Sequence, residues 1–323
     1  MKRKKLTASM IALVMSVSLP MTTYAANWYL EDGSVTVNAD NSGQTVTQGS
    51  GSAVPDEAPV ITQRNSSAET SNTITINASE NATANVTISN VNIDTSGAAV
   101  STGGKGNVNI ELDGTNTLKS GRYHAGLEKS QDGKLTITDE NANGKLIATG
   151  GDYGAGIGGD DQGNGKNITI TGGEVTAAGG TNGAGIGGGL RKEGEKITVS
   201  GDATLKVQGG PTDGWEGAGA GIGNGGSHNG DYFSGTIPVN GAETEPDTSH
   251  LTTGKIEYYA PGADMTKDEP TSTTLGSGQP EPTSPGETAA PVEYRMQTSA
   301  SEPVQGNGKA QDTRLPYKDI FIR

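Results

Sequence analysis

A short alternation of aliphatic and polar residues recurs along the chain. Aliphatic residues take every second position with Thr, Asn or Lys between them, which predicts a short strand with one buried and one solvated face. Five copies occupy residues 85–88, 107–110, 134–137, 167–170 and 196–199. Their starts lie 22, 27, 33 and 29 residues apart. We therefore expect each copy to open one repeat of a larger unit.

A glycine-rich sequel follows these strands. Residues 154–158 and 183–187 both read Gly-Ala-Gly-Ile-Gly and lie 29 residues apart. A third copy, 219–223, is delayed by an insertion around Trp215. One repeat therefore holds three short strands separated by glycine bends.

Stacking such repeats pairs each strand with its equivalent one turn on, about 4.8 Å away. The sequence therefore predicts an all-β fold, a right-handed single-stranded parallel β-helix over residues 26–240, with about seven or eight turns. Ile157, Ile186 and Ile222 should form one inner column.

The composition supports a narrow interior. Only 31% of the 323 residues are hydrophobic and 4% aromatic, while 51 are glycine, so the composition argues against a conventional α/β enzyme core. There is no cysteine, so disulfides cannot hold it together. Repeated hydrogen bonding and packing must supply the order.

Both ends differ from the body. Lys2 to Lys5 precede an apolar stretch and a small-residue exit at Ala25, which is typical of a secretory signal peptide over residues 1–25. Trp28 opens the alternation and is expected to cap the first turn. Residues 241–323 are rich in Pro, Thr, Ser and Glu, which predicts a disordered linker or tail.

Charge narrows the class of partner. The formal charge is −14, and removing the four basic residues of the leader brings it to −18. Nucleic acid is a poor partner for so acidic a chain, whereas neutral glycans or divalent cations fit better. No apolar run is long enough to span a membrane, so we expect a secreted or surface-associated protein without a transmembrane segment.

The residues also resemble a known group of repeats. Residues 150–159, followed by the strand and glycine pair at 167–173, resemble the glycine-rich β-helix repeats of bacterial secreted and cell-surface proteins of Gram-positive anaerobes. Those repeats are similar to carbohydrate-binding β-helix domains related to the pectate-lyase fold. The resemblance implies an adhesive, carbohydrate-binding role toward a polysaccharide or surface glycan.

Aromatic residues beside carboxylates are the natural candidates for a glycan site, because a sugar stacks on a ring and is bracketed by polar groups. Tyr153 lies in a loop next to Asp152, and Trp215 and Tyr232 flank the long insertion. An aromatic lid over the last turns is the structural alternative.

Carboxylates and hydroxyls suggest further sites. Asp160 and Asp161 form a compact pair that fits calcium, although the Gly-Asn-Gly that follows also fits a plain turn. The two aspartates are also candidates for the active site of a polysaccharide lyase, together with Asp152, Glu174, Arg122, Lys166 and Arg191. No repeat, however, carries the dense charged face that a lyase would need. Outward threonines such as Thr136, Thr169 and Thr198 should align as a ladder of hydroxyl groups. Such a ladder could bind an ordered glycan or ice. Alternatively, threonine is there because it suits the solvated face of a strand.

The leading hypothesis is thus a non-enzymatic, carbohydrate-binding β-helix module. A structural spacer or stalk is the second hypothesis, and a lyase-like enzyme is the third.

Overall fold

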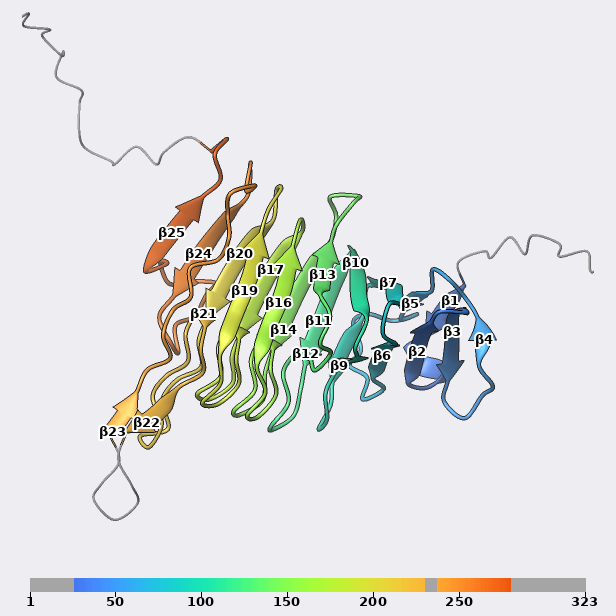
Figure 1. Ribbon diagram of the computed structural model, residues 1–323, viewed down its shortest axis with the longest axis horizontal. Helices are drawn as coiled ribbons and strands as arrows, with labels where there is room; N and C mark the ends of the chain where they lie inside the picture. Colours follow the sequence, from blue (N-terminus) through green and yellow to red (C-terminus); the bar gives the residue numbers. More distant parts are fainter. Residues whose placement is uncertain (1–25, 230–236, 280–323) are drawn as a thin grey trace, which may run out of the picture. The chain divides into compact units, whose positions relative to one another are not determined.

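The computed structural model describes residues 26–229 and 237–279. It is all-β, and its parallel sheets form a β-solenoid of about six turns (Figure 1). The predicted parallel β-helix is therefore confirmed, with fewer turns than the seven or eight expected. The leader at 1–25 and residues 280–323 lie outside the described residues, so the signal peptide and the far part of the tail stay predictions.

Sheet 1 contains all five strands that were predicted from the alternation. It is parallel throughout and runs in the order β1-β5-β7-β10-β13-β16-β19. Thr136, Thr169 and Thr198 are in register across its last three strands, so the expected ladder exists, although Thr136 is only 8% exposed. The strands are β1 (Asn27–Tyr29), β5 (Val60–Thr62), β7 (Thr83–Ser89), β10 (Asn107–Asp113), β13 (Leu135–Thr138), β16 (Gly165–Ile170) and β19 (Gly194–Val199).

Sheet 2 runs in the order β8-β11-β14-β17-β20-β24-β25 and ends in an antiparallel strand. In Figure 1, β24 and β25 are the orange strands at the C-terminal end of this sheet. They are β8 (Asn92–Asp94), β11 (Thr115–Lys119), β14 (Lys145–Thr149), β17 (Glu174–Ala178), β20 (Thr204–Gln208), β24 (Lys255–Tyr259) and β25 (Ser272–Leu275).

Sheet 3 runs in the order β21-β18-β15-β12-β9-β6-β2-β3-β4, with antiparallel pairing only among β2, β3 and β4. One 3-10 turn, η1 (Leu30–Asp32), and an antiparallel hairpin of β22 (Ser227–Asn229) and β23 (Ile237–Val239) complete the described elements. The strands of sheet 3 are β2 (Val35–Asp40), β3 (Gly43–Gln48), β4 (Val54–Pro55), β6 (Ile74–Ala78), β9 (Val100–Gly104), β12 (Leu127–Lys129), β15 (Ile157–Gly158), β18 (Ile186–Gly187) and β21 (Ile222–Gly223).

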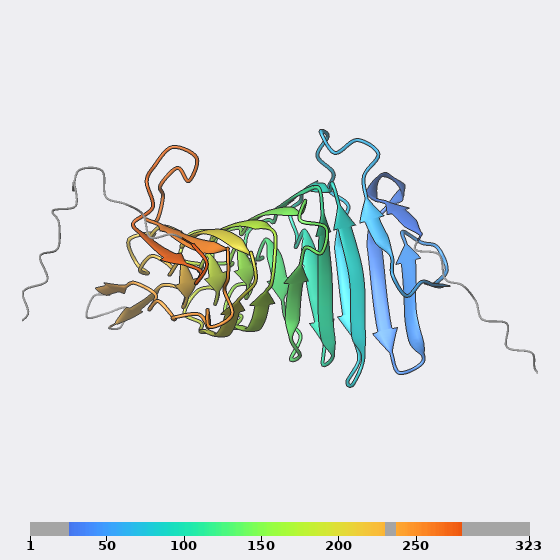
Figure 2. The same ribbon diagram turned by 90° about the horizontal axis from the view of Figure 1, so that it is seen from above.

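The core consists of aliphatic columns that run from turn to turn. Ile157 pairs with Ile186, and Ile186 with Ile222, and all three are fully buried, so the predicted inner column is confirmed. Figure 2 shows the strands of successive turns side by side along the solenoid. Each strand contributes one or a few aliphatic side chains to these columns. A chain with few hydrophobic residues can therefore still fill the narrow interior.

Glycine at the bends lets neighbouring turns approach closely. A Cβ at Gly156 would lie 2.6 Å from the carbonyl oxygen of Gly185 and 2.7 Å from the backbone nitrogen of Ala178. Any larger residue there would push two turns apart. The repeated glycines are therefore a packing requirement of the solenoid.

The C-terminal boundary expected at residue 240 was wrong. Strand β24 pairs in parallel with β20, and Ile256 lies fully buried beside Leu205, so the folded body continues past that boundary. Residues 237–239, which lie inside the predicted β-helix, form β23, which pairs with β22 instead of extending a solenoid sheet. Strand β24 was concealed because its segment, Lys-Ile-Glu-Tyr-Tyr, has one aliphatic residue, Ile256. The second inward position is held by Tyr258, in register with the buried Val207.

Candidate functional site

A cleft of about 320 Å³ lies where the corners of four successive turns meet. Three aromatic rings and several charged side chains converge on it, as a ligand site requires. Its lining residues are Arg122, Tyr123, Tyr153, Asp161, Leu190, Arg191, Asp213, Trp215, Glu216 and His228.

The corner repeats an unusual backbone conformation. Tyr123, Tyr153 and Asn182 occupy equivalent positions in three consecutive turns and have φ angles of 76°, 74° and 65°. The amide of Tyr123 donates to the carbonyl of Asp152, and the amide of Tyr153 to that of Thr181, so the corners are hydrogen-bonded along the axis. This left-handed region suits Asn or Gly, and a tyrosine there is strained. Two such tyrosines side by side therefore point to a function.

The two tyrosine rings form a stack. Their centroids lie 5.7 Å apart with an interplanar angle of 27°. The Arg122 guanidinium lies 4.7 Å from the Tyr123 ring centre and 5.3 Å from that of Tyr153. A hydrogen bond to the Tyr153 hydroxyl raises the pKa of Arg122. Tyr123 remains 44% exposed, so this stack is open on the protein surface.

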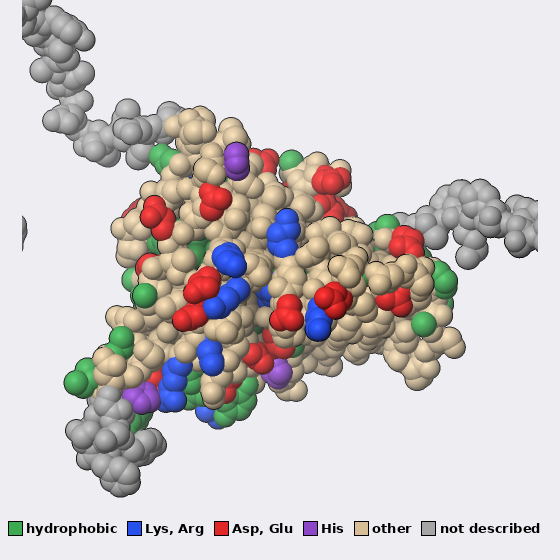
Figure 3. All heavy atoms as spheres, viewed as in Figure 1, with side chains coloured by type: hydrophobic (Ala, Val, Ile, Leu, Met, Phe, Trp, Pro, Cys, Tyr) green, Lys and Arg blue, Asp and Glu red, His purple; other side chains and the backbone are tan. Residues whose placement is uncertain are grey.

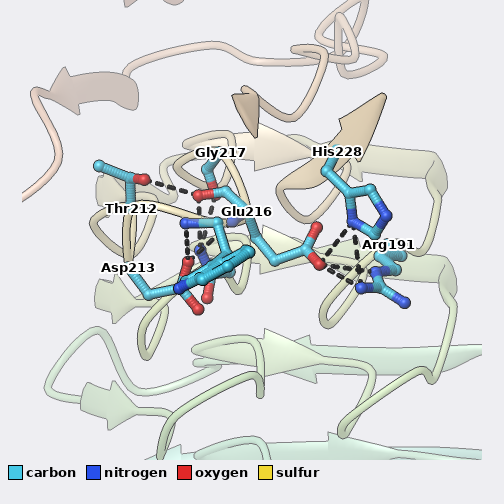
Figure 4. Close-up of polar contacts among 8 residues, drawn as sticks. Arg191, Thr212, Asp213, Glu216, Gly217 and His228 are labelled. Carbon is cyan, nitrogen blue, oxygen red and sulfur yellow. Dashed lines mark hydrogen bonds and ion pairs between the residues drawn. The ribbon is translucent and has the colours of Figure 1, made fainter. Parts of the chain in front are cut away.

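The insertion around Trp215 forms a loop that is closed by hydrogen bonds among residues 212–216 (Figure 4). Asp213 Oδ1 accepts hydrogen bonds from the amides of Trp215 and Glu216, at 2.9 and 2.7 Å. Thr212 Oγ1 donates to the Glu216 carbonyl at 2.6 Å. These bonds hold Trp215 in an outward position, where it is 56% exposed, and turn Glu216 inward, where it is 5% exposed.

Glu216 is the centre of a charged cluster. Its Oε1 accepts from Arg191 Nε at 3.0 Å and from a second nitrogen of the same guanidinium, and His228 Nδ1 lies 2.7 Å from it (Figure 4). The hydrogen bond to Glu216 raises the pKa of Arg191. Glu216 Oε2 is buried and has no hydrogen-bond partner among the residues that the structure describes. One buried carboxylate oxygen thus stays unpaired beside the cleft.

Asn182, which follows Tyr123 and Tyr153 at the equivalent corner position, links this corner to the insertion loop. Its Nδ2 donates to the carbonyls of Glu216 and Gly217, at 3.2 and 2.9 Å. The side chain is fully buried. At the third position of the column, therefore, the side chain turns toward the loop and does not extend the tyrosine stack.

The structure brings most predicted ligand residues together. Tyr153 and Trp215 line the cleft, and Asp152 lies beside it, with its Oδ2 3.8 Å from Arg122 Nε and its Oδ1 accepting from Thr181. Tyr232 lies outside the described residues, so its role stays a prediction.

Tyr123, Glu216 and His228 were not among the residues predicted from the sequence, and Arg122 and Arg191 were predicted only as lyase candidates. The offset of 30 residues between Tyr123 and Tyr153, close to one repeat, was the signal that could have identified the tyrosine pair. Nothing in the linear pattern indicated that Glu216, within the insertion, would turn inward to Arg191 and His228.

The predicted calcium pair separates into two environments. Asp161 lines the cleft, and its Oδ1 is buried without a hydrogen-bond partner among the described residues. Burial raises the pKa of Asp160, which also feels the charge of His124. The Gly163 amide donates to the Asp160 carbonyl at 2.9 Å, so a turn accounts for this segment.

Few acidic side chains gather around Asp160 and Asp161. Across residues 26–229 and 237–279, no three or more His, Asp or Glu side chains form a group that could hold a metal ion. Calcium takes six to eight oxygen ligands, so backbone carbonyls and water would have to supply most of them. Calcium binding by Asp160 and Asp161 stays a prediction, beside the turn that the Gly163 hydrogen bond supports.

Comparisons with known proteins identify no relative: no family model, no curated protein and no solved structure matches this chain. In the part of the chain that the structure describes, no helix has the length and hydropathy of a membrane span. What the cleft binds must therefore be argued from its own chemistry.

Proposed function

We propose that this protein is a non-enzymatic carbohydrate-binding module, exported from the cell, that holds a surface or environmental glycan in the cleft between Tyr153 and Trp215. The observation that carries the proposal is the convergence of three aromatic rings, two arginines and three carboxylates from four turns on one cleft. Aromatic rings bind the C–H faces of a sugar, and charged or amide groups bracket its hydroxyls.

The strain at the two tyrosines supports this proposal. A tyrosine in the left-handed region is unfavourable for folding, and Asn182 shows that the same position accepts a residue suited to that backbone. Tyrosine therefore serves the corner poorly as a purely structural residue. A role in binding explains why two aromatics stand there.

A glycan panel tests the proposal. The full-length exported protein should bind at least one polysaccharide, and Trp215→Ala or Tyr153→Ala should weaken that binding by at least about tenfold. Tyr29→Ala is the matched control, because Tyr29 also lies under a guanidinium, that of Arg64 at 4.1 Å, but outside the cleft. Binding that is lost equally in the control, or retained in both cleft variants, would argue against the cleft.

The spacer alternative rests on the regular ladder itself. A solenoid whose turns pair strand by strand makes a stiff rod, and such a rod would serve as a stalk without any ligand. Absence of binding to every glycan in the panel would favour it.

The lyase alternative is tested in parallel. Incubation with polyuronates, followed by detection of unsaturated uronate products, would replace the binding proposal with an enzymatic one if product formed at a rate that depended on Arg191 or Asp161.

A further inference from the structure

The stack of planar side chains along the corner is interrupted for one turn. Tyr123 and Tyr153 stack on each other, but Asn182, the next residue in the column, turns inward to the insertion loop. Trp215 from that loop lines the same cleft as Tyr153. Tyr153 and Trp215 therefore line the cleft beside the position where a third ring of the stack would lie.

We propose that this interruption is a subsite for a single uncharged pyranose ring, inserted between Tyr153 and Trp215. The inference rests on the proposed glycan-binding function and adds the number of rings held and their charge. The size agrees with one ring, because about 320 Å³ is at the small end of ligand clefts.

The floor of the cleft selects against an anionic sugar. Glu216 and Asp161 each have one carboxylate oxygen without a hydrogen-bond partner among the described residues. Both oxygens are buried, so they act on a ligand through their negative potential, which disfavours a uronate, and not by direct contact.

The cations of the cleft are already engaged. Arg191 donates from Nε and a second nitrogen to Glu216, and Arg122 lies 3.8 Å from Asp152. A ligand carboxylate would have to compete with Glu216 for Arg191, and at Arg122 it would meet the negative field of the nearby Asp152. Hydroxyl groups need no such exchange, so an uncharged sugar fits the charge pattern better.

Tryptophan fluorescence tests the subsite directly, because the chain has only two tryptophans. In a Trp28→Phe variant the emission comes from Trp215 alone, and it should shift and saturate on titration with neutral oligosaccharides that the glycan panel selects. A Trp215→Phe variant, which reports only Trp28, should show no shift. If Trp28→Phe does not fold, because Trp28 Nε1 donates to Asp56, the difference between the natural protein and Trp215→Phe gives the same signal.

Charge selectivity is measured in the same titration. The uronate counterpart of each neutral ligand should bind at least about tenfold more weakly, which is about 1.4 kcal/mol. Equal or tighter uronate binding would overturn the uncharged-ring inference.

The outcomes separate the two proposals. Glycan binding that leaves Trp215 emission unchanged would overturn the inserted ring but leave the binding function standing. Absence of binding to every glycan would remove both.

Discussion

At the scale of single residues, the backbone conformation at one corner of the solenoid does not suit the side chains that the sequence places there. Tyr123 and Tyr153 have positive φ angles, where Gly or Asn is favoured. Asn182 occupies the equivalent position one turn on. Stability therefore favours replacing the tyrosines, whereas the proposed glycan binding would favour keeping them.

We expect Tyr153→Asn to leave the free energy of unfolding within about 1 kcal/mol of the natural value, because relief of strain offsets the lost ring stacking. Glycan binding should fall by at least about tenfold. Tyr258→Asn is the control, since Tyr258 packs against the core and its loss should cost about 3 kcal/mol. Chemical denaturation and glycan titration measure both effects. A large destabilisation by Tyr153→Asn would show that the tyrosine is structural.

Glycine bends provide the second prediction at this scale. Gly156→Ala should destabilise by about 1–3 kcal/mol, because its Cβ would meet the backbone of the next turn. Gly97→Ala is the matched control: a Cβ there meets nothing within 4 Å, so stability should stay or rise by about 0.5 kcal/mol. Similar costs at both sites in thermal unfolding would contradict the close approach of turns.

At the scale of strands, most columns inside the solenoid are aliphatic, but one contains a lysine. Lys129 follows Ile76 and Thr102 in register, is 5% exposed, and donates from Nζ to the Gln131 carbonyl at 2.6 Å. Burial lowers the pKa of Lys129 to about 8. The folded state thus holds an ammonium group where an aliphatic side chain would fit.

The lysine should make stability depend on pH. Below pH 8 the group is charged in both states, and burial of the charge costs about 3 kcal/mol. Above pH 8 the folded state releases the proton before the unfolded state does, so the free energy of unfolding should rise between pH 8 and about 10. Lys129→Met should be more stable at pH 7 and should lack this rise. Denaturation of both proteins across this pH range would contradict the account if their pH profiles were parallel.

The five alternating units could be placed from sequence because a period of two fixes which face is buried. All five lie in sheet 1 on consecutive strands. Strand β24 was missed because its inward positions are held by one isoleucine and one tyrosine, Ile256 and Tyr258, which gives little aliphatic periodicity. Tyr153 and Trp215 could be identified as aromatics in loops. Glu216 is the neighbour of Trp215 in sequence, but its contacts with Arg191 and His228 depend on how separate segments stack, which no local pattern encodes.

At the scale of the described solenoid, the ends must stop the parallel ladder. Antiparallel strands do so at both ends, through β2-β3-β4 and β24-β25. At the edge of sheet 3, Glu243 Oε1 and Oε2 accept from the amides of Gly221 and Ile222 at 2.7 and 3.0 Å. A carboxylate thus takes the place of a further strand, which keeps this edge from pairing with another chain.

We expect Glu243→Ala to lower the free energy of unfolding by about 1–3 kcal/mol, because two amides lose their acceptor. It should also promote self-association. The exposed Glu245→Ala serves as the control with the same change in charge. Denaturation and light scattering measure the two effects, and a monomeric, fully stable Glu243→Ala protein would show that the carboxylate is dispensable.

The fold and the cleft both depend on equivalent residues of successive turns lying directly beside each other, and the lack of cysteine makes this testable by cross-linking. Thr169 and Thr198 pair in register on adjacent parallel strands, about 4.8 Å apart, within disulfide reach. A chain carrying Thr169→Cys and Thr198→Cys should form an intramolecular disulfide on mild oxidation, whereas Thr169→Cys with Thr204→Cys, whose second site lies in sheet 2, should stay reduced. Bond formation in the second pair and not in the first would contradict the stacked turns.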